Sequence, residues 1–377
     1  MKSKKNILIF YPYNKIAVDQ ISVIELLSKK HNIFFLSIDN YGPLHKIIHN
    51  MNIINYSMQD SYEKNGFFIK IKLFYYLHMF VLFSKIISRH NIDIVFSHLE
   101  IPGLISSISS YFYRFKNYYF RHNMDAMSLD SNIKGKFANR IVNYLSKNII
   151  CVSDPVKNYL ITNEKVNTKK INVIEYGYDF DKYFDYQFNN KVSDIRKKYN
   201  SEILLISVGR LVPLKRHLVL LQLMYKLNNS FENKFKLIIL GEGPEQKKMI
   251  NYCKKYNLEN VFLLGFKENI IDYIKASDLL IHFSHSESFG HVVLEAGLSS
   301  VPALACKNTG VFEKFIYHKI NGYLINKNDP LDESFELLSN INSKELQKMG
   351  KKLHKTVLEN FNIKNVINKY FDLIEGC

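Results

Sequence analysis

Two glutamates eight positions apart lie in the segment of this sequence best suited to chemistry. Glu287 and Glu295 belong to the run HSESFGHVVLE, in which a loop carboxylate precedes Gly290 and an amphipathic helix then begins. Backbone N–H groups in the first turn of a helix lack partners within it and favour an anion. The segment therefore predicts a phosphate site around Phe289 and residues 290–292, with a carboxylate on either side.

Paired carboxylates also serve as general acid and base in glycosidases. Beside a bound phosphate they would instead hold sugar and ribose hydroxyls, because ionised carboxylates only accept hydrogen bonds. Ordinary loop and cap acids are a third interpretation of Glu287 and Glu295.

A pair of cations follows an apolar run earlier in the same half. Arg210 comes directly after Gly209, and Lys215 stands five residues further on. A guanidinium and an ammonium at a strand-to-helix turn can clamp a diphosphate. Solvated surface cations are the alternative, although the dipole of the following helix disfavours cations at its start. A further loop, Gly241-Glu-Gly-Pro, lets a ligand approach the backbone but has Gln246 where a dinucleotide fingerprint has its third glycine.

These loops need parallel sheets to position them. Short apolar, β-branched runs alternate with amphipathic stretches of helical length, which is typical of βαβ units. In the second half the predicted strands are 203–208, 236–240, 261–264, 279–283, 303–306 and 323–325. In the first half they are 7–10, 33–36, 94–97, 118–120, 149–152 and 171–174. The fold class is therefore α/β, with two doubly wound, Rossmann-like domains and terminal helices within 344–374.

The length of 377 residues favours two domains. The predicted boundaries are an N-terminal domain at 1–181, a linker at 182–200 without clear periodicity, a C-terminal domain at 201–358, and a final helix at 359–377. For that final helix, packing back on the N-terminal domain is one option.

Charge is concentrated in the first half. Residues 1–170 contain 23 Lys and Arg against 11 Asp and Glu, whereas the remainder is nearly balanced. A basic face attracts anionic lipid, a polyanionic acceptor or nucleic acid, and compositional bias is an equally good explanation. Since no nucleic-acid-binding motif accompanies the charge, nucleic acid is not an expected partner.

The remaining composition indicates a protein of the cytoplasm. The longest apolar stretch, residues 73–83, is too short to span a bilayer, and the four cysteines show no disulfide or zinc spacing. The segment 67–87 fits two descriptions, an amphipathic helix in the head-group region or a helix packed on the first sheet. Peripheral association with the inner face of the cell membrane is therefore one alternative for its location.

The ordered motifs of the second half resemble the retaining GT-B glycosyltransferases of the GT4 type, also called glycosyl transferases group 1. Glu287 and Glu295 match the Glu-x7-Glu signature of that family. The other matching positions are Gly209-Arg210 with Lys215, Gly241-Glu-Gly-Pro244, Leu264-Gly-Phe266, Val301-Pro302, Gly310 with Glu313, and Asn321-Gly322. The resemblance implies a GT-B fold, in which two Rossmann-like domains face a central cleft.

The resemblance also implies roles for individual residues. Arg210 and Lys215 would neutralise the leaving diphosphate, Glu287 would position the donor sugar, and Glu295 would bind the ribose hydroxyls. The base would lie near Gly241 and Phe266. The backbone of Phe289, Gly290, His291 and Val292 would position the donor sugar together with Glu287, and Gly209 is the remaining expected donor-site residue.

In the first half, His122 stands where a sugar-contacting histidine follows a strand in this family, and a packed or capping imidazole is the alternative. Many relatives have a glycine-rich loop after the first strand, whereas this chain has Tyr11-Pro-Tyr-Asn-Lys15. Asp179-Phe-Asp181 imitates a metal-binding Asp-x-Asp motif, but its place near the linker indicates coincidence.

The predicted function is a metal-independent hexosyl- or glycosyltransferase without a cofactor. It would move a sugar from a UDP- or GDP-linked donor to a glycan or lipid-linked acceptor in the synthesis of capsule, lipopolysaccharide or exopolysaccharide. An anionic membrane surface is a candidate partner of the basic half. A nucleotide-sugar epimerase of the same fold and a non-catalytic scaffold protein are the alternatives.

Overall fold

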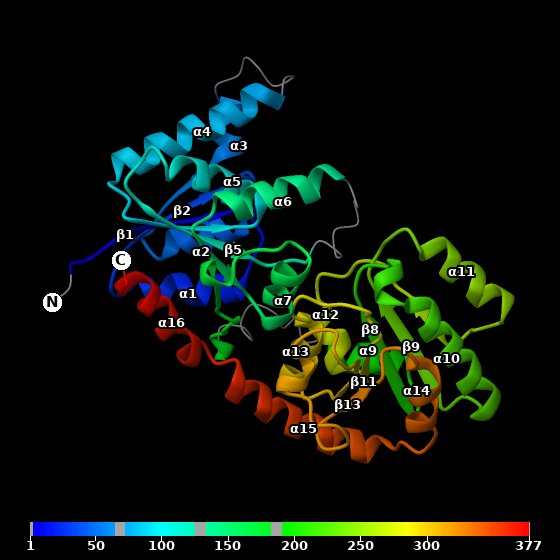
Figure 1. The fold of residues 1–377 in the computed structure, drawn as a ribbon. Coiled ribbons are helices and arrows are strands. Elements are labelled where there is room, and N and C mark those ends of the chain that lie inside the picture. The colour runs from blue at the N-terminus through cyan, green and yellow to red at the C-terminus, as the bar shows by residue number, and fades with distance from the viewer. Residues whose placement is uncertain (1–2, 65–71, 125–132, 182–190, 377) are drawn as a thin grey trace. The chain divides into compact units, whose positions relative to one another are not determined.

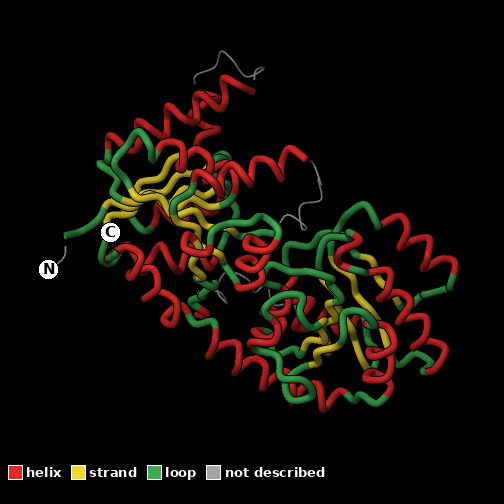
Figure 2. The backbone as a smooth tube through the Cα atoms, viewed as in Figure 1, coloured by secondary structure: helices red, strands yellow, loops and turns green. Residues whose placement is uncertain are grey.

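The computed structural model describes residues 3–64, 72–124, 133–181 and 191–376 (Figure 1). The chain forms two compact units, one of Met1–Asp179 with Asn362–Cys377 and the other of Phe180–Phe361. Figure 2 shows the strands of each unit gathered into a layer between helices. This is the α/β architecture with two parallel sheets that the sequence predicts.

Unit 1 contains a parallel sheet of seven strands in the order β3-β2-β1-β4-β5-β6-β7. The strands are β1 Asn6–Tyr11, β2 Asn32–Ser37, β3 Ile54–Ser57, β4 Ile94–His98, β5 Lys116–Arg121, β6 Asn148–Cys151 and β7 Ile171–Val173. The helices are α1 Val18–Ser28, α2 Pro43–Asn50, α3 Met58–Lys64, α4 Lys72–Arg89, α5 Glu100–Ser109, α6 Ile133–Leu145, α7 Asp154–Thr162 and α16 Ile363–Glu375.

Residues of β1 alternate between the two cores of this sheet, as a strand covered on both faces requires. Ile7 and Ile9 pack in a cluster with residues of α1, α2 and α16, whereas Leu8 and Phe10 pack with residues of α4 and α5. The helix α16 therefore completes the core of unit 1, although it comes last in the chain.

Unit 2 contains six parallel strands in the order β10-β9-β8-β11-β12-β13. The strands are β8 Ile203–Val208, β9 Phe235–Leu240, β10 Val261–Leu263, β11 Leu279–His282, β12 Ala303–Cys306 and β13 Tyr323–Ile325. The helices are α9 Val192–Lys198, α10 His217–Ser230, α11 Gln246–Lys255, α12 Ile270–Lys275, α13 His291–Leu298, α14 Pro330–Ser339 and α15 Ser343–Asn360.

Two details differ from the sequence prediction. The edge strand β3 was not predicted, because INYS has little apolar character and Ile54 is half exposed. Of the predicted linker, 182–190 lies outside the described residues, whereas 191–200 contains α9, whose Ile195 is buried. Each segment buries few side chains, so its local sequence pattern is a weak predictor of its secondary structure.

Candidate functional site

A buried ion pair lies at the carboxyl edge of the sheet in unit 2. The Lys215 ammonium, at the end of the short 3-10 turn Pro213–Lys215 after β8, contacts the Glu287 carboxylate. His282, the last residue of β11, donates from Nε2 to the same Oε1 atom at 2.7 Å. Because β8 and β11 are neighbours in the sheet, Lys215 contacts a carboxylate that lies 72 positions further along the chain.

The electrostatics keep Glu287 ionised. Burial by itself would raise the pKa of this carboxyl, but His282 and Lys215 outweigh it and lower the pKa to about 2. Burial lowers the pKa of His282, and Glu287 opposes that change only in part. At neutral pH we therefore assign a carboxylate held by an ammonium and by a neutral imidazole N–H.

A second buried imidazole stands beside this cluster. His217, the first residue of α10, is 2% exposed, and its Nδ1 atom has no hydrogen-bond partner among the described residues. Burial, with smaller effects of His282 and Lys215, lowers its pKa to about 3. The neutral form of His217 therefore adds no positive charge to the site.

Glycines bring the backbone of three neighbouring strands together at this edge. The N–H of Gly209 donates to Leu240 at 3.0 Å, and that of Gly241 donates to Gly265 at 2.9 Å. A Cβ atom on Gly241 would lie 2.0 Å from the Gly209 oxygen, and its φ of 132° is one that L side chains rarely adopt. This close approach requires glycine.

Phe266 follows these glycines beyond the end of β10. Its side chain is 64% exposed, and its N–H lies 3.4 Å from the Glu242 carboxylate. An exposed aromatic ring beside open backbone provides a stacking surface for a planar ligand such as a nucleotide base.

The predicted phosphate site is the start of α13. Gly290 precedes the helix with a φ of 99°, and a Cβ atom there would collide with the Phe312 ring at 2.2 Å. Phe289 is buried, His291 is exposed, and Val292 and Glu295 are half-buried. Gly310 packs closely beside Glu287, because a Cβ atom placed on Gly310 would lie only 3.1 Å from the Cβ atom of Glu287.

A chain of hydrogen bonds lies at the corresponding edge of unit 1. The His98 Nδ1 atom at the end of β4 lies 2.9 Å from the His122 Nε2 atom after β5. The other ring nitrogen of His122, Nδ1, lies 2.6 Å from the Tyr176 hydroxyl after β7. Both ring nitrogens of His122 are thus already hydrogen bonded within unit 1.

Two members of this chain, His98 and Tyr176, are neutral at neutral pH. Burial lowers the pKa of His98 well below its usual range and raises that of Tyr176 well above it. Two neutral tautomeric arrangements satisfy the chain. One converts to the other when a proton enters at the Tyr176 oxygen, each shared proton moves by one position, and the proton on His98 Nε2 leaves. The chain can therefore relay a proton without holding a net charge.

Arg121 fixes the loop that carries His122. Its side chain is fully buried, its Nη2 atom contacts Glu164 at 3.0 Å, and its Nε atom donates to the Asn123 carbonyl at 2.7 Å. Arg121 thus connects the loop after His122 to Glu164.

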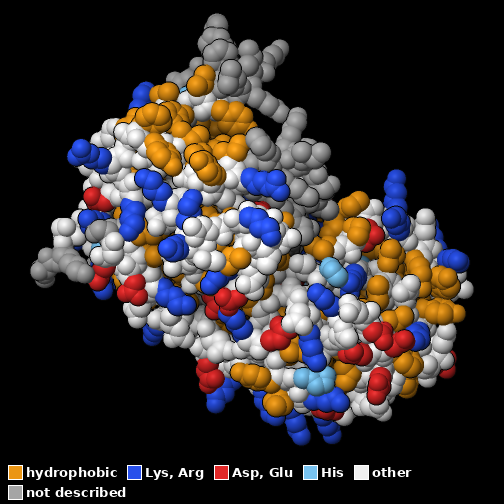
Figure 3. Space-filling model, in the orientation of Figure 1, with side chains coloured by type: hydrophobic (Ala, Val, Ile, Leu, Met, Phe, Trp, Pro, Cys, Tyr) orange, Lys and Arg blue, Asp and Glu red, His pale blue; other side chains and the backbone are white. Residues whose placement is uncertain are grey.

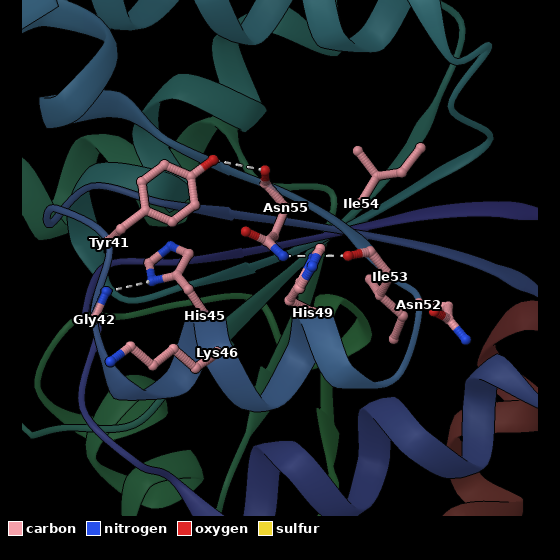
Figure 4. Close-up of a pocket in the computed structure, with 9 residues that line it drawn as sticks. All are labelled: Tyr41, Gly42, His45, Lys46, His49, Asn52, Ile53, Ile54 and Asn55. Carbon is pink, nitrogen blue, oxygen red and sulfur yellow. Dashed lines mark hydrogen bonds between the residues drawn. The ribbon is translucent and has the colours of Figure 1, made fainter.

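Figure 4 shows a different cavity, of about 740 Å³, along α2 and the edge strand β3. Its two histidines come from one face of α2. The His45 Nε2 atom lies 2.9 Å from the Ser37 hydroxyl and its Nδ1 atom accepts from Gly42 at 3.1 Å, so both nitrogens are engaged. None of the predicted site residues lines this cavity.

The structure brings Lys215 and Glu287 into contact and places Gly209, Arg210, Gly241, Phe266 and α13 at the carboxyl edge of the same sheet. His122 lies in unit 1, and the relative placement of the two units is not determined. Within the described ranges, no three His, Cys, Asp or Glu side chains converge as metal ligands.

Four polar residues of these two edges were not predicted from sequence: His282, His217, His98 and Tyr176. His282 ends a strand that is otherwise apolar, and His98 ends one that is apolar except for Ser97. A buried histidine at the carboxyl end of a parallel strand is the signal that would have identified these two, since ligands bind at that edge.

Two family models match the chain. The model described as Glycosyl transferases group 1 matches residues 189–356, and the one described as Glycosyltransferase Family 4 matches residues 56–182.

Curated proteins match over most of their length. The chain is 26% identical over 295 residues to N-acetyl-alpha-D-glucosaminyl L-malate synthase of Bacillus anthracis, covering 76% of this chain and 75% of the relative. It is 25% identical over 304 residues to the UDP-Gal:alpha-D-GlcNAc-diphosphoundecaprenol alpha-1,3-galactosyltransferase of Escherichia coli, covering 77% and 76%. The crystal structure of Anabaena HepE with UDP and glucose has the same fold, with a TM-score of 0.76, 17% identity, and coverage of 99% of this chain and 100% of that one.

Proposed function

Because the chain belongs to the GT4-type glycosyltransferases, we propose that it is a retaining, metal-independent enzyme acting on a nucleoside diphosphate sugar. Its acceptor is a hydroxyl group of a glycan or a lipid-linked sugar, in the synthesis of a surface polysaccharide. The observation that carries this proposal is the convergence of Lys215 and Glu287 at the sheet edge that also holds the start of α13.

The contacts suggest that different residues bind the phosphates, the sugar, the ribose and the base of the donor. Lys215, held in place by Glu287, and the exposed Arg210 would stabilise the leaving diphosphate together with the N–H groups at the start of α13. Glu287, fixed by Lys215 and His282, would accept hydrogen bonds from donor hydroxyls. Glu295 would hold the ribose, and Phe266 would stack on the base.

In the transfer step, the acceptor hydroxyl oxygen bonds to the anomeric carbon as the bond from that carbon to the diphosphate oxygen breaks. The hydroxyl proton would pass into the His98–His122–Tyr176 chain, which releases a proton at its other end. The diphosphate leaves with the electron pair, and its charge must be stabilised without a metal ion. The His98–His122–Tyr176 chain would lie near the acceptor and accept hydrogen bonds from its hydroxyls.

The nature of the acceptor is supported by one relative in particular. The name of the E. coli galactosyltransferase specifies a sugar on diphosphoundecaprenol as its acceptor and UDP-galactose as its donor. A lipid-linked acceptor for this chain would place the enzyme at the inner face of the membrane. In the portion that the structure describes, no helix is long and apolar enough to cross a bilayer.

A thermal-shift measurement tests the proposal. Ligand at one hundred times its Kd stabilises the folded state by about 2.7 kcal/mol. We expect either UDP or GDP to raise the Tm in EDTA as much as in magnesium. Glu295→Ala should abolish this shift, and Glu336→Ala, at an exposed position of α14, should retain it.

A shift that disappears in EDTA would contradict metal independence. An absence of any shift with the whole panel of nucleotides and nucleotide sugars would contradict a donor site. Turnover of a nucleotide sugar to its epimer in the absence of acceptor would indicate an epimerase instead of a transferase.

A further inference from the structure

The outer surface of the helices α4, α5 and α6 in unit 1 exposes large aromatic side chains that take no part in the site described above. Tyr144 on α6 is 81% exposed and Phe112 after α5 is 75% exposed. On α4, Leu77 and Val81 are about half exposed. Figure 3 shows hydrophobic side chains gathered over α4 with Lys and Arg side chains beside them. Soluble proteins rarely expose such a group of side chains without an interaction partner.

Direct contacts connect these side chains into one surface. The Tyr111 hydroxyl donates to the Leu145 carbonyl at 3.3 Å, and the Lys147 ammonium lies 5.2 Å from the centre of the Tyr111 ring. A groove of about 650 Å³ lined by Val81, Lys85 and Tyr113, among others, joins α4 to the segment after α5. We call this the basic aromatic surface, represented by Val81, Lys85, Phe112, Arg114, Tyr144 and Lys147.

The charge of this layer is predominantly positive. Residues 72–92, 100–124 and 133–153, which contain α4, α5 and α6, have ten Lys and Arg and one acidic residue, Glu100 at the start of α5, although the whole chain has 35 acidic residues in 377. Lys85, Arg114 and Lys147 are exposed on the surface just defined. At its margin, Asp93 lines a neighbouring cavity with Phe112 and Lys147, and its carboxylate accepts the Asn6 N–H at 2.8 Å.

We propose that the basic aromatic surface docks the protein on a membrane of anionic phospholipid. Tyr and Phe side chains favour the head-group region, where the ring is in an apolar layer and a hydroxyl remains in water. Lys and Arg beside them meet lipid phosphates, and the small number of carboxylates limits the repulsion that an anionic surface would otherwise exert. The purpose of such docking rests on the proposed lipid-linked acceptor, but its physical test requires no turnover.

The test is sedimentation of the full chain with vesicles of phosphatidylcholine, either pure or in an equimolar mixture with phosphatidylglycerol. We expect wild type to pellet with the mixture, to stay in solution with pure phosphatidylcholine, and to be released by high salt. Arg114→Gln with Lys147→Gln should weaken binding about thirtyfold, at about fivefold for each cation lost. Phe112→Ser with Tyr144→Ser should weaken it about tenfold.

Matched controls come from unit 2. Tyr317→Ser with Ile320→Ser removes two large side chains that are about half exposed, and Lys351→Gln with Lys352→Gln removes two exposed cations. Both control variants should bind the mixed vesicles as wild type does. A nucleotide-induced thermal shift retained by every variant would show that each one is folded.

Failure of wild type to pellet with the mixed vesicles would overturn the inference. So would binding that depends on Arg114 and Lys147 but not on Phe112 and Tyr144, as expected for nucleic acid or another polyanion. The same applies if the unit 2 controls weaken binding equally. A wild type that binds vesicles but shows no shift with any nucleotide would instead contradict the proposed function and leave the docking surface standing.

Discussion

The carboxyl edges of the two sheets have the same place in the same kind of fold, yet they use opposite electrostatics. In unit 2, Lys215 and Glu287 form a buried ion pair whose carboxylate stays ionised down to about pH 2. In unit 1, two imidazoles and a phenol, those of His98, His122 and Tyr176, form a hydrogen-bonded chain. The first arrangement fixes a charge in place, and the second can move a proton without creating one.

This difference fits the two halves of a transfer reaction. A leaving diphosphate develops negative charge, which is stabilised best by fixed partners in a site with little water. An attacking hydroxyl must instead lose a proton, which requires neutral groups able both to donate and to accept. Four experiments test whether the two edges divide the work in this way.

The largest expected effect comes from breaking the ion pair in unit 2. Lys215→Met and Glu287→Gln should each lower kcat by about 100-fold or more, because a preorganised charge partner is typically worth about 3 kcal/mol in such a site. Steady-state rates with the nucleotide sugar identified by thermal shift measure this.

The matched control is Lys226→Met, which removes an exposed ion pair with Asp332 in the same unit. Exposed pairs contribute about 1 kcal/mol or less to stability, and this one is remote from β8 and β11, so kcat should not change. Equal losses in Lys226→Met and Lys215→Met would show that the effect reflects folding and not the site.

The next effect concerns acid sensitivity at His217. Its pKa of about 3 in the folded protein lies below its usual value of 6.5, so the unfolded chain binds a proton that the folded chain excludes between these values. This stabilisation is complete above pH 6.5 and is lost as the pH falls toward 3. When the pH is lowered from 7 to 5, the unfolding free energy of wild type should fall by about 2 kcal/mol more than that of His217→Leu.

Urea denaturation at the two pH values measures that difference. His49→Gln, at an exposed position of α2, should behave as wild type does. Identical pH dependence in wild type and His217→Leu would mean that the imidazole is solvated.

A smaller effect is expected from removing one end of the His98–His122–Tyr176 hydrogen-bonded chain in unit 1. Tyr176→Phe removes only the hydroxyl that bonds to the His122 Nδ1 atom, and one such neutral hydrogen bond is worth about 1 kcal/mol. We expect kcat to fall about fivefold to tenfold, with a changed pH profile and an unchanged KM for the donor. Tyr41→Phe, which removes an exposed hydroxyl bonded to Asn55, serves as control. A higher donor KM in Tyr176→Phe would place this chain in donor binding instead.

The smallest effect compares one exposed aromatic from each unit. Phe266→Ala should weaken UDP or GDP binding by a factor of about five, since base stacking is worth about 1 kcal/mol. Tyr13→Ala, in the loop after β1 where relatives have glycines, should leave nucleotide binding unchanged and alter the KM of the acceptor. Titration calorimetry with the nucleotide distinguishes the two, and equal losses would show that the units do not divide donor from acceptor.

Much of the fold could be predicted because its strands are buried on both faces. Runs such as ILLISV at β8 and ALAC at β12 are apolar except for Ser207, so composition and length locate them within a residue or two. The half-exposed strand β3 and the short helix α9 give no comparable signal. Within the donor site, the spacing of Glu287 and Glu295 and the cations after Gly209 were visible, because they follow strands directly.

The sequence by itself determined two parallel α/β sheets, the loops that carry the candidate chemistry, and the uneven charge along the chain, because these depend on local composition and spacing. Only the tertiary structure decided which of those groups meet. The contact of Lys215 with Glu287 joins the neighbouring strands β8 and β11, which are distant in sequence. The chain from His98 to Tyr176 joins the ends of β4, β5 and β7 in the other sheet. Strand order sets such contacts, and the burial that comes with them sets the charge of each group.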